Sequence, residues 1–111
     1  MKDATFAPAY VAFYPMLAEI ARDHGYALAI HGSVTRDFDL IAIPWRSDAL
    51  DATDLINKIA KYASMFTLQN ETNQVAIGPE IKPHGRRAWS ILMGNGAVID
   101  LSVMPLIENA D

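Results

Sequence analysis

The spacing of apolar residues changes along the chain, and this change constrains the fold more than any other feature. Over residues 7–24 apolar side chains recur every three or four positions, as on one face of an amphipathic helix. Over residues 26–30 and 37–43 they form short runs that are typical of strands. Neighbouring segments therefore need different secondary structures, which predicts a domain that contains both helices and a sheet.

The predicted order is helix, strand, strand, helix and three further strands. The first helix, 7–24, contains Pro15, which should kink it or split it into two pieces. The second helix covers 47–66, with Leu50 facing the core and Ser47 or Asp48 as its N-cap. The last strands are expected at 73–77, 87–93 and 97–104, with Asn95–Gly96 as a hairpin turn.

These elements are expected to form one domain over residues 1–111, with a loose tail from about residue 105. A mixed sheet with both main helices on one face would bury all the apolar stripes. The sequence therefore predicts a two-layer α+β fold.

Composition excludes several classes of function. The net charge of −4 disfavours broad binding to duplex nucleic acid, which usually needs a basic face. The chain has no cysteine, so disulfides, thiolate zinc sites and cysteine nucleophiles are all excluded. No run approaches the roughly 20 apolar residues of a membrane span. We therefore expect no membrane insertion, and a cytoplasmic location.

Two aspartates stand two positions apart at the start of a predicted strand. Side chains at this spacing point to the same face, so Asp37 and Asp39 should lie about 7 Å apart while Phe38 points into the core. Carboxylates in this arrangement can hold one hard divalent cation, or lie on either side of a pair. The alternative is that both are exposed residues on the solvent face of a half-buried strand.

A third aspartate interrupts the apolar run 98–103, which should be a central strand. Carboxylates are seldom buried unless they are paired or coordinated, so Asp100 is a candidate third metal ligand. It could instead lie at the end of the strand, facing water beside Ser102. Gly32–Ser33 precedes the aspartate pair, and a glycine there lets the backbone approach a phosphate closely, although this dipeptide is also common in ordinary loops.

Together these features resemble the nucleotidyltransferase superfamily that includes DNA polymerase beta and the minimal nucleotidyltransferases. A helix and a strand lead to a Gly-Ser signature, an Asp-x-Asp strand follows, and a third carboxylate lies on a later strand. The resemblance covers about residues 8–104. The chain also resembles small proteins of phage and bacterial genomes with similar His-Gly-Ser and Lys-Pro-His-Gly-Arg-Arg segments, a likeness that implies no activity.

The resemblance implies a nucleotidyltransferase-like fold and a reaction in which a nucleoside monophosphate moves from a nucleoside triphosphate to a hydroxyl. Mg²⁺ or Mn²⁺ would be the cofactor. The residues implied to hold the metal and to act in catalysis are Asp37, Asp39 and Asp100. The residues implied to bind the nucleotide are Gly32, Ser33, Arg36, Arg86 and Arg87.

Two other functions are compatible with the same residues. Only Val34, Thr35 and Arg36 separate Ser33 from Asp37, a shorter phosphate loop than in typical members of the superfamily. A catalytically degenerate module that binds a nucleotide or a protein partner is therefore the main alternative. The chain could also be a structural or regulatory subunit, or a homodimer. The basic segment 82–87 could bind an anion, or could be a solvated turn that keeps an edge strand from pairing.

Overall fold

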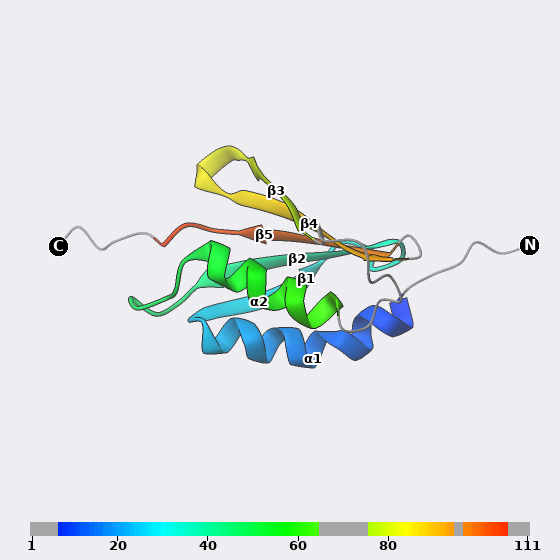
Figure 1. The fold of residues 1–111 in the computed structure, drawn as a ribbon. Helices are drawn as coiled ribbons and strands as arrows, with labels where there is room; N and C mark the ends of the chain where they lie inside the picture. The colour runs from blue at the N-terminus through cyan, green and yellow to red at the C-terminus, as the bar shows by residue number, and fades with distance from the viewer. Residues whose placement is uncertain (1–6, 65–75, 95–96, 107–111) are drawn as a thin grey trace, which may run out of the picture.

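The computed structural model describes residues 7–64, 76–94 and 97–106. Two helices, α1 (Ala7–Asp23) and α2 (Ala52–Ser64), lie on the same side of a sheet, as Figure 1 shows. The strands of this sheet are β1 (Tyr26–His31), β2 (Asp37–Pro44), β3 (Ala76–Ile81), β4 (Arg87–Gly94) and β5 (Ala97–Val103). The predicted α+β class, with a mixed sheet and two helices, is confirmed.

The sheet has the strand order β1-β2-β5-β4-β3. β2 and β5 run parallel, whereas the other three pairs are antiparallel. β5 is the last strand in the chain but occupies the centre of the sheet. The pairing of β5 with β2 thereby joins two strands that are far apart in the sequence.

The core lies between the helices and one face of the sheet. Along β2 and β5 every second residue points to this face and is apolar, which gives the alternation expected of a sheet covered on one side. Phe38, Leu40, Ile99 and Leu101 are fully buried there. The helices contribute the following buried side chains: Tyr10, Leu17, Ile20, Ala21, Leu55, Ile56, Ile59 and Ala63.

Helix α1 agrees with the predicted helix except at Pro15. The helix continues through this residue as one element, so of the two expectations, a kink or a split, the split is wrong. Pro15 lies on the exposed side of the helix, where the carbonyl group of the preceding turn can tilt toward solvent. The cost of the missing N–H group is lowest at such a position.

Helix α2 begins at Ala52, later than predicted, and the expected N-caps Ser47 and Asp48 precede it. The cause is a tertiary contact: the N–H group of Leu50 donates to the carbonyl oxygen of His24 at 2.9 Å. This bond ties residue 50 to His24, directly after the end of α1, and Leu50 is 48% exposed instead of facing the core. The predicted end of this helix at residue 66 lies outside the described residues.

The last three strands are found in the predicted order. β3 covers Ala76–Ile81, displaced from the predicted 73–77, of which residues 73–75 lie outside the described chain. β4 and β5 pair antiparallel as expected, while their predicted turn at residues 95–96 and the tail beyond 106 lie outside it as well. Neither helix of the described chain has the length and hydropathy that a membrane crossing requires.

Candidate functional site

A row of polar side chains crosses the sheet on the face that the helices leave open. In the strand register His31 lies opposite Asp39, Asp39 opposite Asp100, and Asp100 opposite Ser90. The row therefore runs over four adjacent strands, from β1 to β4. Asp37 precedes Asp39 by two positions and belongs to the same face. The three aspartates predicted from the sequence are thus brought to one face of two neighbouring strands.

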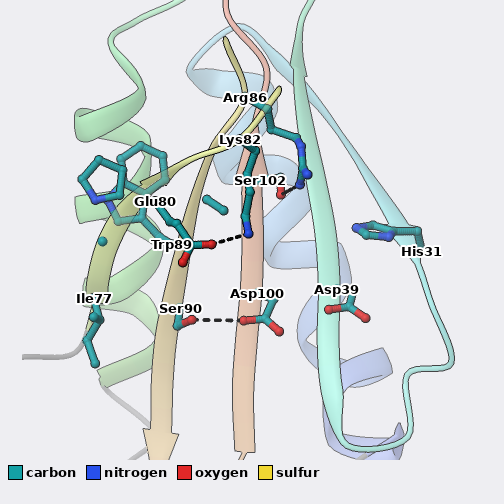
Figure 2. A pocket seen from close by; sticks show the side chains of 13 residues that line it. His31, Asp39, Ile77, Glu80, Lys82, Arg86, Trp89, Ser90, Asp100 and Ser102 are labelled. Atoms are coloured by element: carbon teal, nitrogen blue, oxygen red, sulfur yellow. Dashed lines mark hydrogen bonds and ion pairs between the residues drawn. The ribbon is translucent and has the colours of Figure 1, made fainter. Parts of the chain in front are cut away.

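The polar row lies in a hollow of about 560 Å³, drawn in Figure 2. The side-chain hydroxyl of Ser90 donates to Oδ1 of Asp100 at 3.2 Å. Asp39 and Asp100 point into the hollow side by side from β2 and β5 (Figure 2). The hollow is lined by His31, Asp39, Ile77, Gly78, Pro79, Glu80, Lys82, Arg86, Ala88, Trp89, Ser90, Asp100 and Ser102.

Asp37 lies beside the hollow without lining it. Its pKa is raised above the ordinary value for an aspartate, first by partial burial and then by the negative charge of Asp100 and a hydrogen bond with that residue. The positive charge of Arg36 acts in the opposite direction and lowers the same pKa. The carboxyl group of Asp37 therefore lies close enough to Asp100 on the neighbouring strand for the charge of Asp100 to act on it.

The Gly32–Ser33 loop approaches the acidic row through its backbone. Gly32 has φ +79°, and a Cβ atom at this position would lie 2.5 Å from Oδ2 of Asp39. A larger residue would be strained by this backbone conformation and would have to displace the Asp39 carboxylate. Val34 also has a positive φ, 61°, which is a strained conformation for a β-branched residue. Gly32 therefore contacts the side chain of Asp39, but none of the three predicted residues Gly32, Ser33 and Arg36 lines the hollow.

Tyr10 connects the helix layer to both strands that carry the aspartates. Its hydroxyl donates to the carbonyl oxygen of Arg36 at 2.5 Å and accepts from the N–H group of Val98 at 3.0 Å. Its ring stacks on Phe38 with centroids 4.9 Å apart. Burial raises the pKa of Tyr10, the hydrogen bond from Val98 lowers it, and the charges of the three aspartates raise it again.

The sequence analysis identified Tyr10 only as an apolar residue of the first helix. Periodicity shows which face of a helix is buried, but it carries no information on what a hydroxyl at that position will contact. The signal that was available is chemical: a buried tyrosine needs a partner for its hydroxyl.

The basic segment before β4 divides its cations between two faces. Nη1 of Arg86 donates to Oγ of Ser102 at 2.7 Å, over the hollow. Nζ of Lys82 is paired with the carboxylate of Glu80 in the same hollow. Arg87 instead lies in register with Val103, on the helix side of the sheet.

The environment of Arg87 differs accordingly. Its guanidinium lies 5.6 Å from the ring centroid of Trp89, and Nη2 is 3.9 Å from Oδ1 of Asp51. Successive strand residues point to opposite faces, so two adjacent arginines cannot both reach one ligand from β4. Of the three arginines predicted to bind a nucleotide, Arg36, Arg86 and Arg87, only Arg86 lines the hollow.

The donor chemistry of the acidic row suits a hard divalent cation, which prefers carboxylate oxygens. Gly32 also allows the Asp39 carboxylate to lie directly against the loop backbone, where a Cβ atom would be 2.5 Å from Oδ2. Within the described residues, however, no three His, Asp or Glu side chains are arranged as ligands of one ion. The residue types and their shared face fit a cation, and binding one would require the carboxylates to turn from their present contacts.

The chain was compared with known protein families, curated proteins and solved structures. None of them matches. The function must therefore be argued from the chemistry of the hollow, because the fold class alone is compatible with many activities.

Proposed function

We propose that this protein is a Mg²⁺-dependent nucleotidyltransferase that moves a nucleoside monophosphate from a nucleoside triphosphate to a hydroxyl group. The observation that carries the proposal is the shared register of Asp39 and Asp100 on two parallel strands, with Asp37 on the same open face. The negative charges of carboxylates grouped in this way repel one another unless a cation is present. The order of helix, strand, Gly-Ser loop and aspartate strands agrees with the superfamily that the sequence resembles.

Each residue has a role that follows from its position. Asp37 and Asp39 would hold the cation against the triphosphate, and Asp100 would help to hold it and accept the proton of the acceptor hydroxyl. A bound cation would supply neutralisation of phosphate charge. Ser90 occupies Oδ1 of Asp100 and so fixes the orientation of that carboxylate. Gly32 lets the backbone of the loop come close to the Asp39 carboxylate, because it has no Cβ atom.

The proposed reaction is an in-line displacement at the α-phosphorus. The hydroxyl oxygen of the acceptor forms a bond to this phosphorus as the bond to the bridging oxygen of the β-phosphate breaks. Pyrophosphate leaves with the bonding electron pair, and the hydroxyl proton passes to Asp100. Any molecule whose hydroxyl reaches the row is a candidate acceptor, since the hollow is open to solvent on the uncovered face.

A second candidate function is nucleotide binding without turnover. It is favoured by the short segment between Ser33 and Asp37, which leaves few residues to hold the phosphates. In this case the cation and the nucleotide would bind the same row. Release of pyrophosphate in the presence of acceptor hydroxyls is the measurement that separates the two functions.

The first test is a titration with Mg²⁺ or Mn²⁺ followed by NMR, with and without a non-hydrolysable nucleoside triphosphate. We expect shifts centred on residues 32–39 and on Asp100, strengthened by the nucleotide and lost in Asp39→Asn. Asp23→Asn is the matched control, because Asp23 is exposed at the end of α1, on the helix side of the sheet. An unperturbed spectrum at millimolar metal would overturn the proposal.

A further inference from the structure

Arg86 is the cation of the hollow whose charge is not already paired. It is half-buried, and Nη1 bonds to the hydroxyl of Ser102, which is itself only 7% exposed. Among the residues that the structure describes, Arg86 forms no ion pair with a carboxylate, whereas Lys82 is paired with Glu80. A guanidinium has several N–H donors, and the bond to Ser102 uses one of them. The remaining donors are available to an anion.

Arg86 and the acidic row occupy different ends of the hollow. Ser102 follows Asp100 by two positions on β5 and points to the same face, so the two side chains are about 7 Å apart along the strand. Figure 2 shows Arg86 over Ser102 at one end, and Asp39 and Asp100 further along the strands. The hollow therefore has a fixed electrostatic polarity along β5.

This polarity would give a phosphate chain one preferred direction. An anion alone is repelled from the end that holds Asp39 and Asp100, and a cation is needed for phosphate to bind there. At the other end a guanidinium can take phosphate oxygens directly through paired, charge-assisted hydrogen bonds. A ligand with several linked phosphates can use both ends at once, whereas a monophosphate can use only one.

We propose that Arg86 and Ser102 form the subsite for the terminal phosphates of the nucleotide, so that the triphosphate lies along β5 and is selected over the monophosphate. This inference rests on the proposed function, because the acidic row must bind the cation at the other end. It assigns Arg86 to the leaving pyrophosphate, whose developing negative charge the guanidinium would stabilise. Ser102 positions the guanidinium through the bond to Nη1.

The experiment compares the Mg²⁺-dependent affinity of a non-hydrolysable ATP analogue with that of AMP, by calorimetry, in the wild type and in Arg86→Gln. We expect Arg86→Gln to weaken binding of the ATP analogue about tenfold or more, which is typical for loss of a charge-assisted bond, and to leave AMP binding unchanged. Arg87→Gln is the matched control: it removes the same charge from the adjacent position on the opposite face, and both affinities should stay at wild-type values.

Two further variants sharpen the result. Arg86→Lys keeps the charge without the planar pair of donors and should lose part of the affinity for the ATP analogue. Ser102→Ala should lose less than Arg86→Gln, because the charge remains and only its orientation is released. NMR spectra of each variant without nucleotide would identify any that fails to fold, and Arg86→Lys then decides in place of Arg86→Gln.

The outcomes separate this inference from the proposed function. If the wild type binds the ATP analogue through Asp39 but Arg86→Gln and Arg87→Gln behave alike, the subsite is overturned and the metal site remains. If Arg86→Gln weakens the binding of AMP as much as the binding of the ATP analogue, the proposed direction of the phosphate chain is wrong. If the wild type binds neither nucleotide with Mg²⁺, both proposals fall.

Discussion

The two faces of the sheet are made by the same strands, yet they differ in almost every property. On the helix side Phe38, Leu40, Ile99 and Leu101 are completely buried. On the open side, one position away on the same strands, stand Asp39, Asp100 and Ser102. The backbone that holds the two sets is shared, so the core fixes the spacing of the polar groups without contacting them. Alternation of side chains thus gives one strand a buried apolar face on one side and a row of polar groups on the other.

Adjacent residues on β2 provide the largest expected contrast between the faces. Leu40→Ala should lower the free energy of unfolding by about 2–5 kcal/mol, because it leaves a cavity in the core. Asp39→Ala should leave the protein folded and change this free energy by less than about 0.5 kcal/mol, or raise it by relieving repulsion between carboxylates. Urea denaturation measures both. A loss in Asp39→Ala close to that in Leu40→Ala would mean that the open face is also structural.

Tyr10 connects the two faces, because it is a residue of the core whose hydroxyl bonds to the backbone next to the aspartates. Tyr10→Phe keeps the ring but leaves the Val98 N–H and the Arg36 carbonyl without this partner, so we expect a loss of about 1–3 kcal/mol. Tyr14→Phe is the control, because the Tyr14 hydroxyl makes a 2.6 Å bond to the Leu28 carbonyl, away from the row.

The Tyr10 and Tyr14 variants should have similar losses of stability but different responses to metal. Both variants should unfold more easily, but only Tyr10→Phe should weaken the Mg²⁺-dependent shifts of residues 37–39 and 98–100. Equal metal responses in the two variants would show that the hydroxyl of Tyr10 has a purely structural effect.

Gly32 tests how closely the loop is fitted to the open face. Gly32→Ala should cost about 1–2 kcal/mol for the left-handed backbone conformation and should also displace the Asp39 carboxylate. Gly85→Ala is the matched control, with φ +76° and a Cβ atom that would lie 3.1 Å from Cγ of Pro105. Denaturation should give similar losses for the two variants, and only Gly32→Ala should weaken metal binding. Unchanged metal affinity in Gly32→Ala would separate the loop from the site.

The smallest expected effect is a pH dependence of stability due to Asp37. Its pKa is raised in the folded protein, so its contribution to stability is present below the ordinary pKa of an aspartate and is lost as the pH rises through the raised value. Asp37→Asn should therefore match the wild type at acidic pH and become the more stable protein at neutral pH, without metal.

Thermal unfolding of both proteins in EDTA from about pH 3 to about pH 7 measures this difference. Arg36→Gln should extend the window to higher pH, because the charge of Arg36 lowers the pKa of Asp37. A difference between wild type and Asp37→Asn that does not vary with pH would contradict the proposed interaction between the carboxyl groups.

Much of the fold could be predicted because its determinants are local. The spacing of apolar residues gave the class and order of the elements, and the alternation around Phe38 identified the buried face. The start of α2 could not be predicted, because the bond between Leu50 and His24 joins residues that are distant in the sequence. The strand register could not be predicted for the same reason, although it creates the row of Asp39 and Asp100.

The sequence predicted the aspartates of the candidate site. It did not predict which of the basic residues lie beside them. The aspartates share a face because their spacing and their strands require it. The separation of Arg86 from Arg87 was implied by the predicted strand 87–93, but the sequence analysis grouped both arginines as nucleotide-binding residues. The contact between Arg86 and Ser102 depends on the pairing of β4 with β5 and had no local signal.

The central position of β5 has a consequence for how the protein assembles. β1 with β2, and β3 with β4, can each form a ladder between near neighbours in the chain, but only β5 joins these two halves. Its pairing with β2 closes a long loop and therefore carries a high entropic cost, which should make it a late step in folding. Asp39 and Asp100 become neighbours in that same step. A ligand that bridges Asp39 and Asp100 would stabilise the pairing of β2 with β5. Amide hydrogen exchange along these two strands would then slow when the ligand binds.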